Sequence, residues 1–258
     1  VGGDVNEPQP VEDSPALGMI PSRLQELIGA HHIGADELAR TVDGSIQTDD
    51  PWTTADISVN EWAKPIYRIG TNAEYPPFEM VDTNGNLEGF DIDLMNAIAD
   101  AAGFIVQWTN TRWDGIFVAL AAGEFDAVIS AATITEERAE TGDFSDPYFE
   151  AGQSITIRAD TTDIAGPADL DGRPVGVQLG TTGDIWLTEQ TGAEVVRYDE
   201  NTLAFQSLGQ GDVDAAVADS PTAAEIVRAN PEMMLKVLPE AYTDELYGIA
   251  VRKERPEV

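Results

Sequence analysis

The 258-residue sequence contains no cysteine, few basic residues and no long apolar run. The absence of cysteine excludes disulfide bridges and thiolate metal sites. No stretch of about eighteen consecutive apolar residues occurs, so no segment has the composition of a transmembrane helix. Apolar residues nevertheless make up 42% of the chain. The sequence is therefore typical of a globular protein with a buried core.

Basic residues number 14, against 47 Asp plus Glu, and the formal net charge is -33. Such a charge repels polyanions, which argues against nucleic acids and anionic membrane surfaces as partners. Histidine is also scarce, since His31 and His32 are the only two. Adjacent residues point to different sides of a helix, so this pair is a poor joint metal ligand. We expect neither a metal site nor another cofactor.

The first 64 residues differ in composition from the rest. They are rich in Pro, Gly and acidic residues, and only the segment 22–42, "SRLQELIGAHHIGADELARTV", has the pattern of one or two short helices. From Ile66 onward, strand-like and helical segments alternate, which predicts an α/β domain with a largely parallel sheet. The helix expected before Gly103 carries Phe90, Leu94, Ile98 and Ala102 at helical spacing.

Two segments of the chain resemble each other. Residues 104–133 and 193–222 share the order strand, turn, helix, Gly and strand, with Asp126 and Asp214 in matching places. A repeat of this length predicts two similar lobes. Ligands of open α/β sheets bind beyond the carboxyl ends of the strands. This rule places Ser130 to Thr133 on one wall of a shared cleft and Asp219 on the other.

Arg138 is a rare basic residue within the acidic segment 133–148. Three interpretations are open: a solvated helix face, an ion pair with Glu137 or Asp143, or a bidentate clamp on an anionic ligand group. The residue follows a predicted helix cap at Thr135 and lies near the expected cleft.

Asp219 ends the corresponding strand of the second half, and it has two interpretations. Buried there, its carboxylate would need a cationic partner such as an ammonium group. Alternatively, Asp219 or Ser220 caps a helix that has Pro221 in its first turn.

Three further features have a structural and a functional interpretation. The segment 179–184, "LGTTGD", is an anion-friendly turn before a helix, but it lacks the pattern of a phosphate loop. The segment 82–89 predicts a tight Asn-Gly hairpin rather than a calcium loop, because Gly85 occupies the fourth place instead of the sixth. Tyr75 and Trp113 are either core aromatics or cleft walls.

Five segments in succession resemble the signatures of the family-3 extracellular solute-binding proteins, which capture polar amino acids for bacterial ABC importers. These segments, which fall within residues 66 to 253, are "GTNAEYPPFEMVDTNGNLEGFDIDL", "WDGIFVALAAGEFDAVISAATITEER", "DFSDPYFEAGQSI", "GVQLGTTGD" and "DAAVADSP". Their order makes the resemblance specific. It implies a two-lobe, periplasmic-binding-protein-like α/β fold of type II. Two crossover strands, near 148–157 and 246–253, would join the lobes and allow hinge closure.

The resemblance also implies roles for individual residues. Arg138 would bind the ligand's α-carboxylate with help from Thr133 and Thr182, and Asp219 would hold the α-ammonium. Four more residues would line the pocket: the aromatic pair Tyr75 and Trp113, and the backbone of Ser130 and Ala131.

Two nearby residues bear on the ligand's side chain. Asn72 stands where relatives often have an acidic residue that contacts a basic or amide side chain. We therefore expect a polar or neutral amino acid rather than arginine or lysine. Glu74, two residues further along, offers a carboxylate for a positively charged side chain, so a cationic ligand stays an alternative.

The expected organisation is an arm at 1–64, a first lobe at 65–155, a second lobe at 156–246 and a return strand at 247–258, without the C-terminal helices of the family. We expect a non-enzymatic protein, with its export signal removed, that binds a free amino acid outside the cytoplasm and delivers it to the membrane subunits of an ABC importer. Two alternatives stay open: an assembly or filament subunit that self-associates through the arm, and a cyclohexadienyl-dehydratase-like enzyme with Glu74 as general acid.

Overall fold

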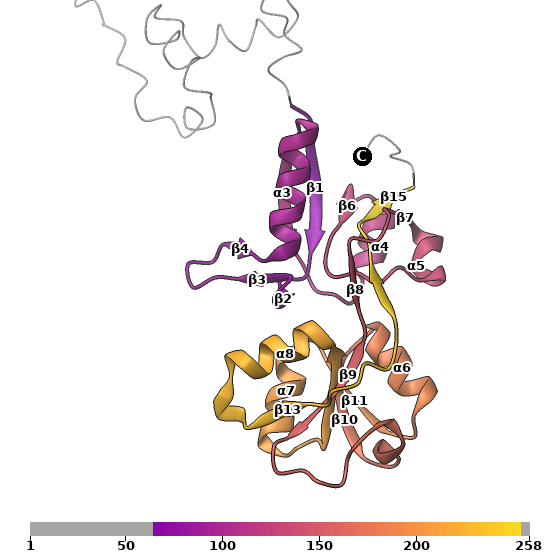
Figure 1. Ribbon diagram of the computed structural model, residues 1–258. Coiled ribbons are helices and arrows are strands. Elements are labelled where there is room, and N and C mark those ends of the chain that lie inside the picture. The colour runs from indigo at the N-terminus through magenta and orange to yellow at the C-terminus, as the bar shows by residue number, and fades with distance from the viewer. Residues whose placement is uncertain (1–63, 254–258) are drawn as a thin grey trace, which may run out of the picture. The chain divides into compact units, whose positions relative to one another are not determined.

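The computed structural model describes residues 64–253, which contain two five-stranded sheets (Figure 1). The predicted arm, its two histidines and its proposed self-association concern residues outside this range, as do the last five positions of the chain.

The first sheet contains β1 (Ile66–Thr71), the strand with which the described part of the chain begins. Its order is β5 (Ile105–Asn110), β1, β6 (Ala127–Val128), β15 (Ala250–Arg252) and β7 (Gly142–Phe144). Strand β1 is parallel to β5 and β6, whereas β15 is antiparallel to β6 and β7. Because parallel neighbours end at the same edge, the segments after β1 and β6 lie together.

The second sheet repeats this arrangement. Its order is β11 (Glu194–Tyr198), β10 (Pro174–Gln178), β12 (Ala215–Asp219), β9 (Gln153–Arg158) and β13 (Leu235–Val237). Here β10 is parallel to β11 and β12, and β9 is antiparallel to β12. The internal repeat therefore corresponds to two sheets of the same topology, each completed by a strand that arrives from the other lobe.

Two short strands connect the lobes. Strand β8 (Phe149–Ala151) leads from the first lobe into β9, and β14 (Glu245–Tyr247) leads back towards β15. The two strands pair antiparallel, with Ala151 opposite Glu245. The two predicted crossover strands are confirmed.

Three helices flank each sheet. They are α3 (Phe90–Ala102), α4 (Ile116–Ala122) and α5 (Glu136–Thr141) in the first lobe, and α6 (Thr182–Gln190), α7 (Asn201–Gln210) and α8 (Ser220–Ala229) in the second. Two 3-10 turns, η3 (Pro167–Leu170) and η4 (Pro231–Met233), complete the second lobe. Both faces of the second sheet are covered, as is usual for a largely parallel sheet.

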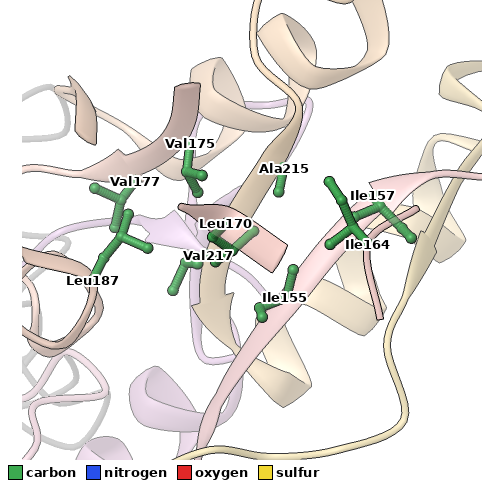
Figure 2. Packing of buried hydrophobic residues seen from close by; sticks show 9 residues of the cluster. All are labelled: Ile155, Ile157, Ile164, Leu170, Val175, Val177, Leu187, Ala215 and Val217. Atoms are coloured by element: carbon green, nitrogen blue, oxygen red, sulfur yellow. The ribbon is translucent and has the colours of Figure 1, made fainter. Parts of the chain in front are cut away.

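The core of the second lobe shows how strand alternation packs side chains. Figure 2 shows one side, where alternate residues of β9, β10 and β12 meet Leu170 of η3 and Leu187 of α6. The intervening residues, such as Ala216 and Ala218, pack with α7 and α8 on the opposite face. Successive strand residues point to opposite faces, so β12 contributes to both layers.

The predicted helix before Gly103 is confirmed as α3, and its buried face is not the stripe whose spacing indicated the helix. The helix ends at Gly103 in a left-handed conformation, as expected, but its buried apolar residues are Ile92, Met95 and Ala99. Phe90 is 45% exposed and contacts other rings at the edge of the lobe. The helix has two apolar stripes at the same spacing, and periodicity alone does not tell which one faces the sheet.

A small three-stranded sheet extends from the first lobe. It contains β2 (Glu74–Tyr75), β3 (Glu79–Val81) and β4 (Leu87–Glu88). Asp82 accepts hydrogen bonds from the backbone N–H groups of Asn84 and Asn86 at 2.7 and 2.8 Å, which closes the β3–β4 turn. The predicted hairpin at 82–89 is confirmed, and it brings Glu79 back beside Tyr75.

Candidate functional site

A small cavity lies between the two lobes, beyond the carboxyl ends of β1, β6, β10 and β12. Its lining includes every residue predicted for the site except Glu74: Asn72, Tyr75, Trp113, Ser130, Ala131, Thr133, Arg138, Thr182 and Asp219. Three residues that the sequence analysis missed, Glu79, Gln178 and Thr181, complete it.

Arg138 lies in the first turn of α5, where its backbone N–H is capped by the Thr135 hydroxyl at 3.1 Å. The residue is only 9% exposed, which contradicts the solvated-face interpretation. Its guanidinium donates to the carbonyl of Thr133 at 2.8 Å and forms no salt bridge with any carboxylate of residues 64–253. The proposed ion pair with Glu137 or Asp143 is therefore wrong as well. A guanidinium with five N–H donors keeps most of them available for an anion.

Two rings flank this guanidinium. Its central carbon lies 4.9 Å from the ring centroid of Trp113 and 5.0 Å from that of Phe117. Burial lowers the pKa of Arg138, and the negative charges of Glu245 and Asp219 oppose this effect. Since an arginine pKa starts above about 12, the group stays charged at neutral pH.

Asp219 ends β12, directly before α8, but its side chain makes no cap hydrogen bond to that helix. The helix-cap interpretation of this side chain is therefore wrong. Its carboxylate instead accepts hydrogen bonds from the Tyr247 hydroxyl and the Gln153 amide, and its backbone N–H donates to the Tyr75 hydroxyl at 3.3 Å.

The carboxylate of Asp219 is also buried without a cation. The residue is 4% exposed and forms no salt bridge within the described range. Burial raises the pKa of Asp219 to about 6, because it removes water from the charged form, while the hydrogen bond from Tyr247 opposes the shift. The cavity thus holds a guanidinium from one lobe and a carboxylate from the other, each without a partner of opposite charge.

Hydrogen bonds join the two lobes around the cavity. The indole N–H of Trp113 donates to the carbonyl of Gly180 at 3.0 Å, and the amide of Gln178 donates to Asn72 Oδ1 at 3.1 Å. Asn72 Nδ2 in turn donates to the carbonyl of Thr111 at 3.0 Å, so both ends of this amide are engaged.

The 179–184 segment also meets the cavity. Thr181 caps α6 by accepting the N–H of Asp184, and the hydroxyl of Thr182 accepts a hydrogen bond from Gln153 at 3.2 Å.

Glu74 lies outside this cavity. It lines a neighbouring pocket with Asn72, Arg112, Asp199 and Glu200. Its side chain is hydrogen-bonded to Glu200 of the other lobe, and partial burial together with this contact raises the pKa of Glu74 to about 7. Beside it, Arg112 and Asp199 form a salt bridge of 2.6 Å between the lobes.

Of the missed residues, Gln178 could have been found from the sequence. It ends β10 as Asp219 ends β12, and the strand-end rule applies to both. Glu79 carried no such signal, because β3 has three residues and shows no usable alternation. Its carboxyl group is fully buried and accepts a hydrogen bond from the Ser130 hydroxyl at 2.8 Å.

Residues 64–253 contain neither a candidate metal site nor a helix that could span a membrane. No group of three or more His, Cys, Asp or Glu residues there could hold a metal ion. No helix in this part of the chain combines the length and apolar character needed to cross a membrane.

The chain is similar to several proteins of known family. Residues 67–258 match the family profile described as "Bacterial extracellular solute-binding proteins, family 3". A "probable histidine-binding protein" of Neisseria gonorrhoeae is 41% identical over 194 residues, which are 73% of this chain and 72% of that protein.

Solved structures agree with this match. An ancestral arginine-binding protein bound to arginine superposes with a TM-score of 0.72 at 45% identity, covering 75% of this chain and 87% of that one. The arginine-, lysine-, histidine-binding protein ArtJ of Geobacillus stearothermophilus has a TM-score of 0.70 at 36% identity, over 75% and 84% of the two chains. The profile covers most of the sequence and the relatives share its fold, so the chain belongs to the family-3 extracellular solute-binding proteins of ABC import systems.

Proposed function

We propose that the chain binds a free amino acid in the cavity between its lobes and delivers it, outside the cytoplasmic membrane, to the membrane subunits of an ABC importer. One observation carries this proposal. The cavity contains a buried guanidinium, Arg138, and a buried carboxylate, Asp219, neither of which has an ionic partner among the described residues. Buried charges are costly unless they are paired. An amino-acid zwitterion supplies both missing partners.

The ligand's carboxylate would bind Arg138, because the planar guanidinium can donate two parallel hydrogen bonds to it. The hydroxyl groups of Thr133 and Thr182 would be further donors. The ligand's ammonium group would bind the Asp219 carboxylate, with Ser130 and Ala131 also lining the cavity. This arrangement uses groups from both lobes, so the ligand itself favours the closed form.

The side-chain class of the ligand depends on the residues next to Asn72. The sequence favoured a neutral side chain because of Asn72, and this preference stays unconfirmed. Relatives are named for binding histidine and arginine, and carboxylates of Glu74, Asp199 and Glu200 lie next to Asn72. This neighbouring pocket has three carboxyl groups against one guanidinium, that of Arg112, and a net acidic pocket favours cations over acidic ligands. We propose a basic amino acid, with arginine and histidine as the first candidates.

Titration calorimetry tests the proposal directly. We expect one molecule of arginine or histidine to bind per chain, glutamine to bind more weakly, and aspartate not to bind. Arg138→Ala should abolish binding, whereas Arg228→Ala should not, because Arg228 lies on the surface of α8 in a pair with Glu225. Failure of the unmodified chain to bind any amino acid would contradict the proposal.

The enzymatic alternative depended on Glu74 as a general acid. Glu74 lies outside the cavity that holds Arg138 and Asp219, so it is not beside the reacting α-carbon end of a ligand bound there. We propose a binding role without turnover. Incubation with prephenate or arogenate should leave either compound unchanged, and formation of an aromatic product would support the enzyme instead.

A further inference from the structure

Two buried acids lie side by side: Glu79 of β3, which lines the cavity, and Asp91 of α3, which does not. Both are fully buried, and no salt bridge joins either to a basic residue in the described range. Each has one oxygen without a donor, Oε2 of Glu79 and Oδ1 of Asp91. The two side chains are hydrogen-bonded to each other, which requires a proton on one of them. A single shared proton thus accounts for both unsatisfied oxygens.

The hydrogen bonds assign this proton to Glu79. Asp91 accepts the backbone N–H of Ala131 at 2.7 Å and the hydroxyl of Tyr148 at 2.8 Å, so its negative charge is well stabilised. Glu79 accepts only the Ser130 hydroxyl through its other oxygen. Burial and the neighbouring Asp91 raise the pKa of Glu79 well above its usual range, whereas hydrogen bonds oppose the effect of burial on Asp91, whose pKa rises to about 6.

The pair connects directly to the lining of the cavity. The Ser130 hydroxyl, which donates to Glu79, accepts the backbone N–H of Asn72 at 3.0 Å. Ala131, which donates to Asp91, has a φ of 43°. This left-handed conformation is strained for a residue with a Cβ and persists only where its surroundings enforce it. The two acids therefore hold the backbone N–H groups of Asn72 and Ala131 and the hydroxyl of Ser130 through successive hydrogen bonds.

We propose that Glu79 is a positioning residue for ligand binding: protonated and bonded to Asp91, it holds Asn72, Ser130 and Ala131 in the arrangement that lines the cavity. This inference rests on the proposed function, because its main consequence is a change in amino-acid affinity. Ionisation of Glu79 places two negative charges side by side and removes the bond between them. Affinity should consequently fall as the pH rises to the point where the pair loses its proton.

The effect of this pair on the pH dependence of affinity has to be distinguished from the effects of other titratable groups nearby. Those that act on Glu79, or face it from neighbouring elements, are Asp219, Tyr75, Tyr148 and Tyr247. Burial raises the pKa of each tyrosine, so none of them ionises near neutral pH. Asp219 gains its charge as the pH rises, which increases affinity for an ammonium group. Its effect therefore has the opposite sign.

Three variants test the proposal by calorimetry with arginine, histidine and glutamine between pH 5 and about 9. Glu79→Gln keeps an N–H donor for Asp91 and an oxygen for Ser130, so its affinity at pH 7 should lie within about 3-fold of the original. It should also lose the alkaline fall in affinity. Glu79→Ala removes both bonds and should bind about 10-fold or more weakly. Glu88→Gln, on the exposed side of adjacent strand β4, is the matched control and should behave like the unmodified chain.

A second measurement does not depend on the ligand. The infrared spectrum at pH 7 should contain the carbonyl band of a buried protonated carboxyl group in addition to that of the partly protonated Glu74. The band of the buried group should be lost in Glu79→Gln but kept in Glu88→Gln. Unchanged affinity in a folded Glu79→Ala, or absence of the band, would overturn the inference. If the unmodified chain binds no amino acid while the band behaves as described, the proposed function fails and the protonated state of Glu79 stands.

Discussion

Trp113 contacts the guanidinium of Arg138 with its ring and the opposite lobe with its edge. The ring centroid lies 4.9 Å from the guanidinium carbon, and the indole N–H donates to the carbonyl of Gly180 at 3.0 Å. Stacking on an aromatic face keeps the guanidinium plane in one orientation. One side chain therefore both orients the anion-binding group and contacts the second lobe in the closed form.

Trp113→Phe should separate these two contributions. Phenylalanine keeps an aromatic face for Arg138 but loses the hydrogen bond to Gly180, so we expect about 3- to 10-fold weaker binding, mostly through faster dissociation. Stopped-flow fluorescence would measure both rates. Trp108→Phe is the matched control, because its indole bonds Asn96 within the first lobe at 3.3 Å. Equal effects of the two substitutions would contradict a role for Trp113 in closure.

Arg138→Ala should lose amino-acid binding while the fold is retained. Truncating one partner of a buried charge pair costs about 2–5 kcal/mol or more, much of it because the other charge is left unpaired. Arg138→Lys should lose nearly as much, since an ammonium group cannot form two parallel bonds to a carboxylate. Calorimetry gives the affinities and circular dichroism checks the fold. Retained affinity in Arg138→Lys would show that a point charge is enough.

Asp219 should make binding sensitive to mild acid. Its pKa of about 6 in the empty site means that it is half protonated near that pH, and the neutral form attracts an ammonium group poorly. The contribution of Asp219 to affinity should be nearly constant above pH 7 and should fall by about 10-fold per pH unit well below pH 6. Asp219→Asn should bind weakly at all pH values, with no acid dependence. It should discriminate little between an amino acid and its des-amino analogue.

The empty protein should become less stable as the pH rises from about 4 to 7. Asp91 and Asp219 each have a pKa of about 6 in the fold, above the value of about 3.9 in an unfolded chain. A group whose pKa is raised by folding binds its proton more tightly in the folded state. Its stabilising effect is complete below the unfolded pKa and is lost as the pH passes the folded pKa. Scanning calorimetry of the ligand-free chain would show a falling Tm, with a smaller slope in Asp219→Asn.

The sequence predicted the features of the fold that depend on local pattern and on chain order. Alternating segments and the internal repeat correspond to two sheets of equal topology, and the strand-end rule placed Asp219 and Ser130 on facing walls. These predictions succeeded because the order of the strands and the pattern of apolar residues can be read directly from the sequence.

The remaining features depend on contacts between distant segments. Glu79 and Asp91 are 12 positions apart on different elements, and nothing in their own segments shows that they share a proton. The position of Glu74 outside the cavity likewise depends on Glu200 in the other lobe. Arg138 had three open interpretations until its burial and its lack of a carboxylate partner in the described range were known.

The last prediction concerns the acid pair at the mouth of the cleft, where Glu74 of the first lobe is hydrogen-bonded to Glu200 of the second. Burial and this contact raise the pKa of Glu74 to about 7 in the closed form. Opening separates the two side chains and returns the pKa of Glu74 towards its usual value of about 4.3. The proton therefore favours the closed form, and this contribution is lost as the pH rises through about 7.

The ligand's side chain decides how this pair affects binding. For glutamine, which brings no positive charge, affinity should fall by about 2- to 5-fold between pH 6 and 8, since partly exposed charges interact by only ~0–1 kcal/mol. For arginine, the ligand's own cation can replace the shared proton next to Asn72, so affinity should hold or rise over the same range. Glu200→Gln should remove the fall for glutamine and weaken arginine, while Glu194→Gln on exposed β11 should change neither. An equal fall for both ligands would show that the arginine side chain does not reach the pair, and it would return the preference to neutral amino acids.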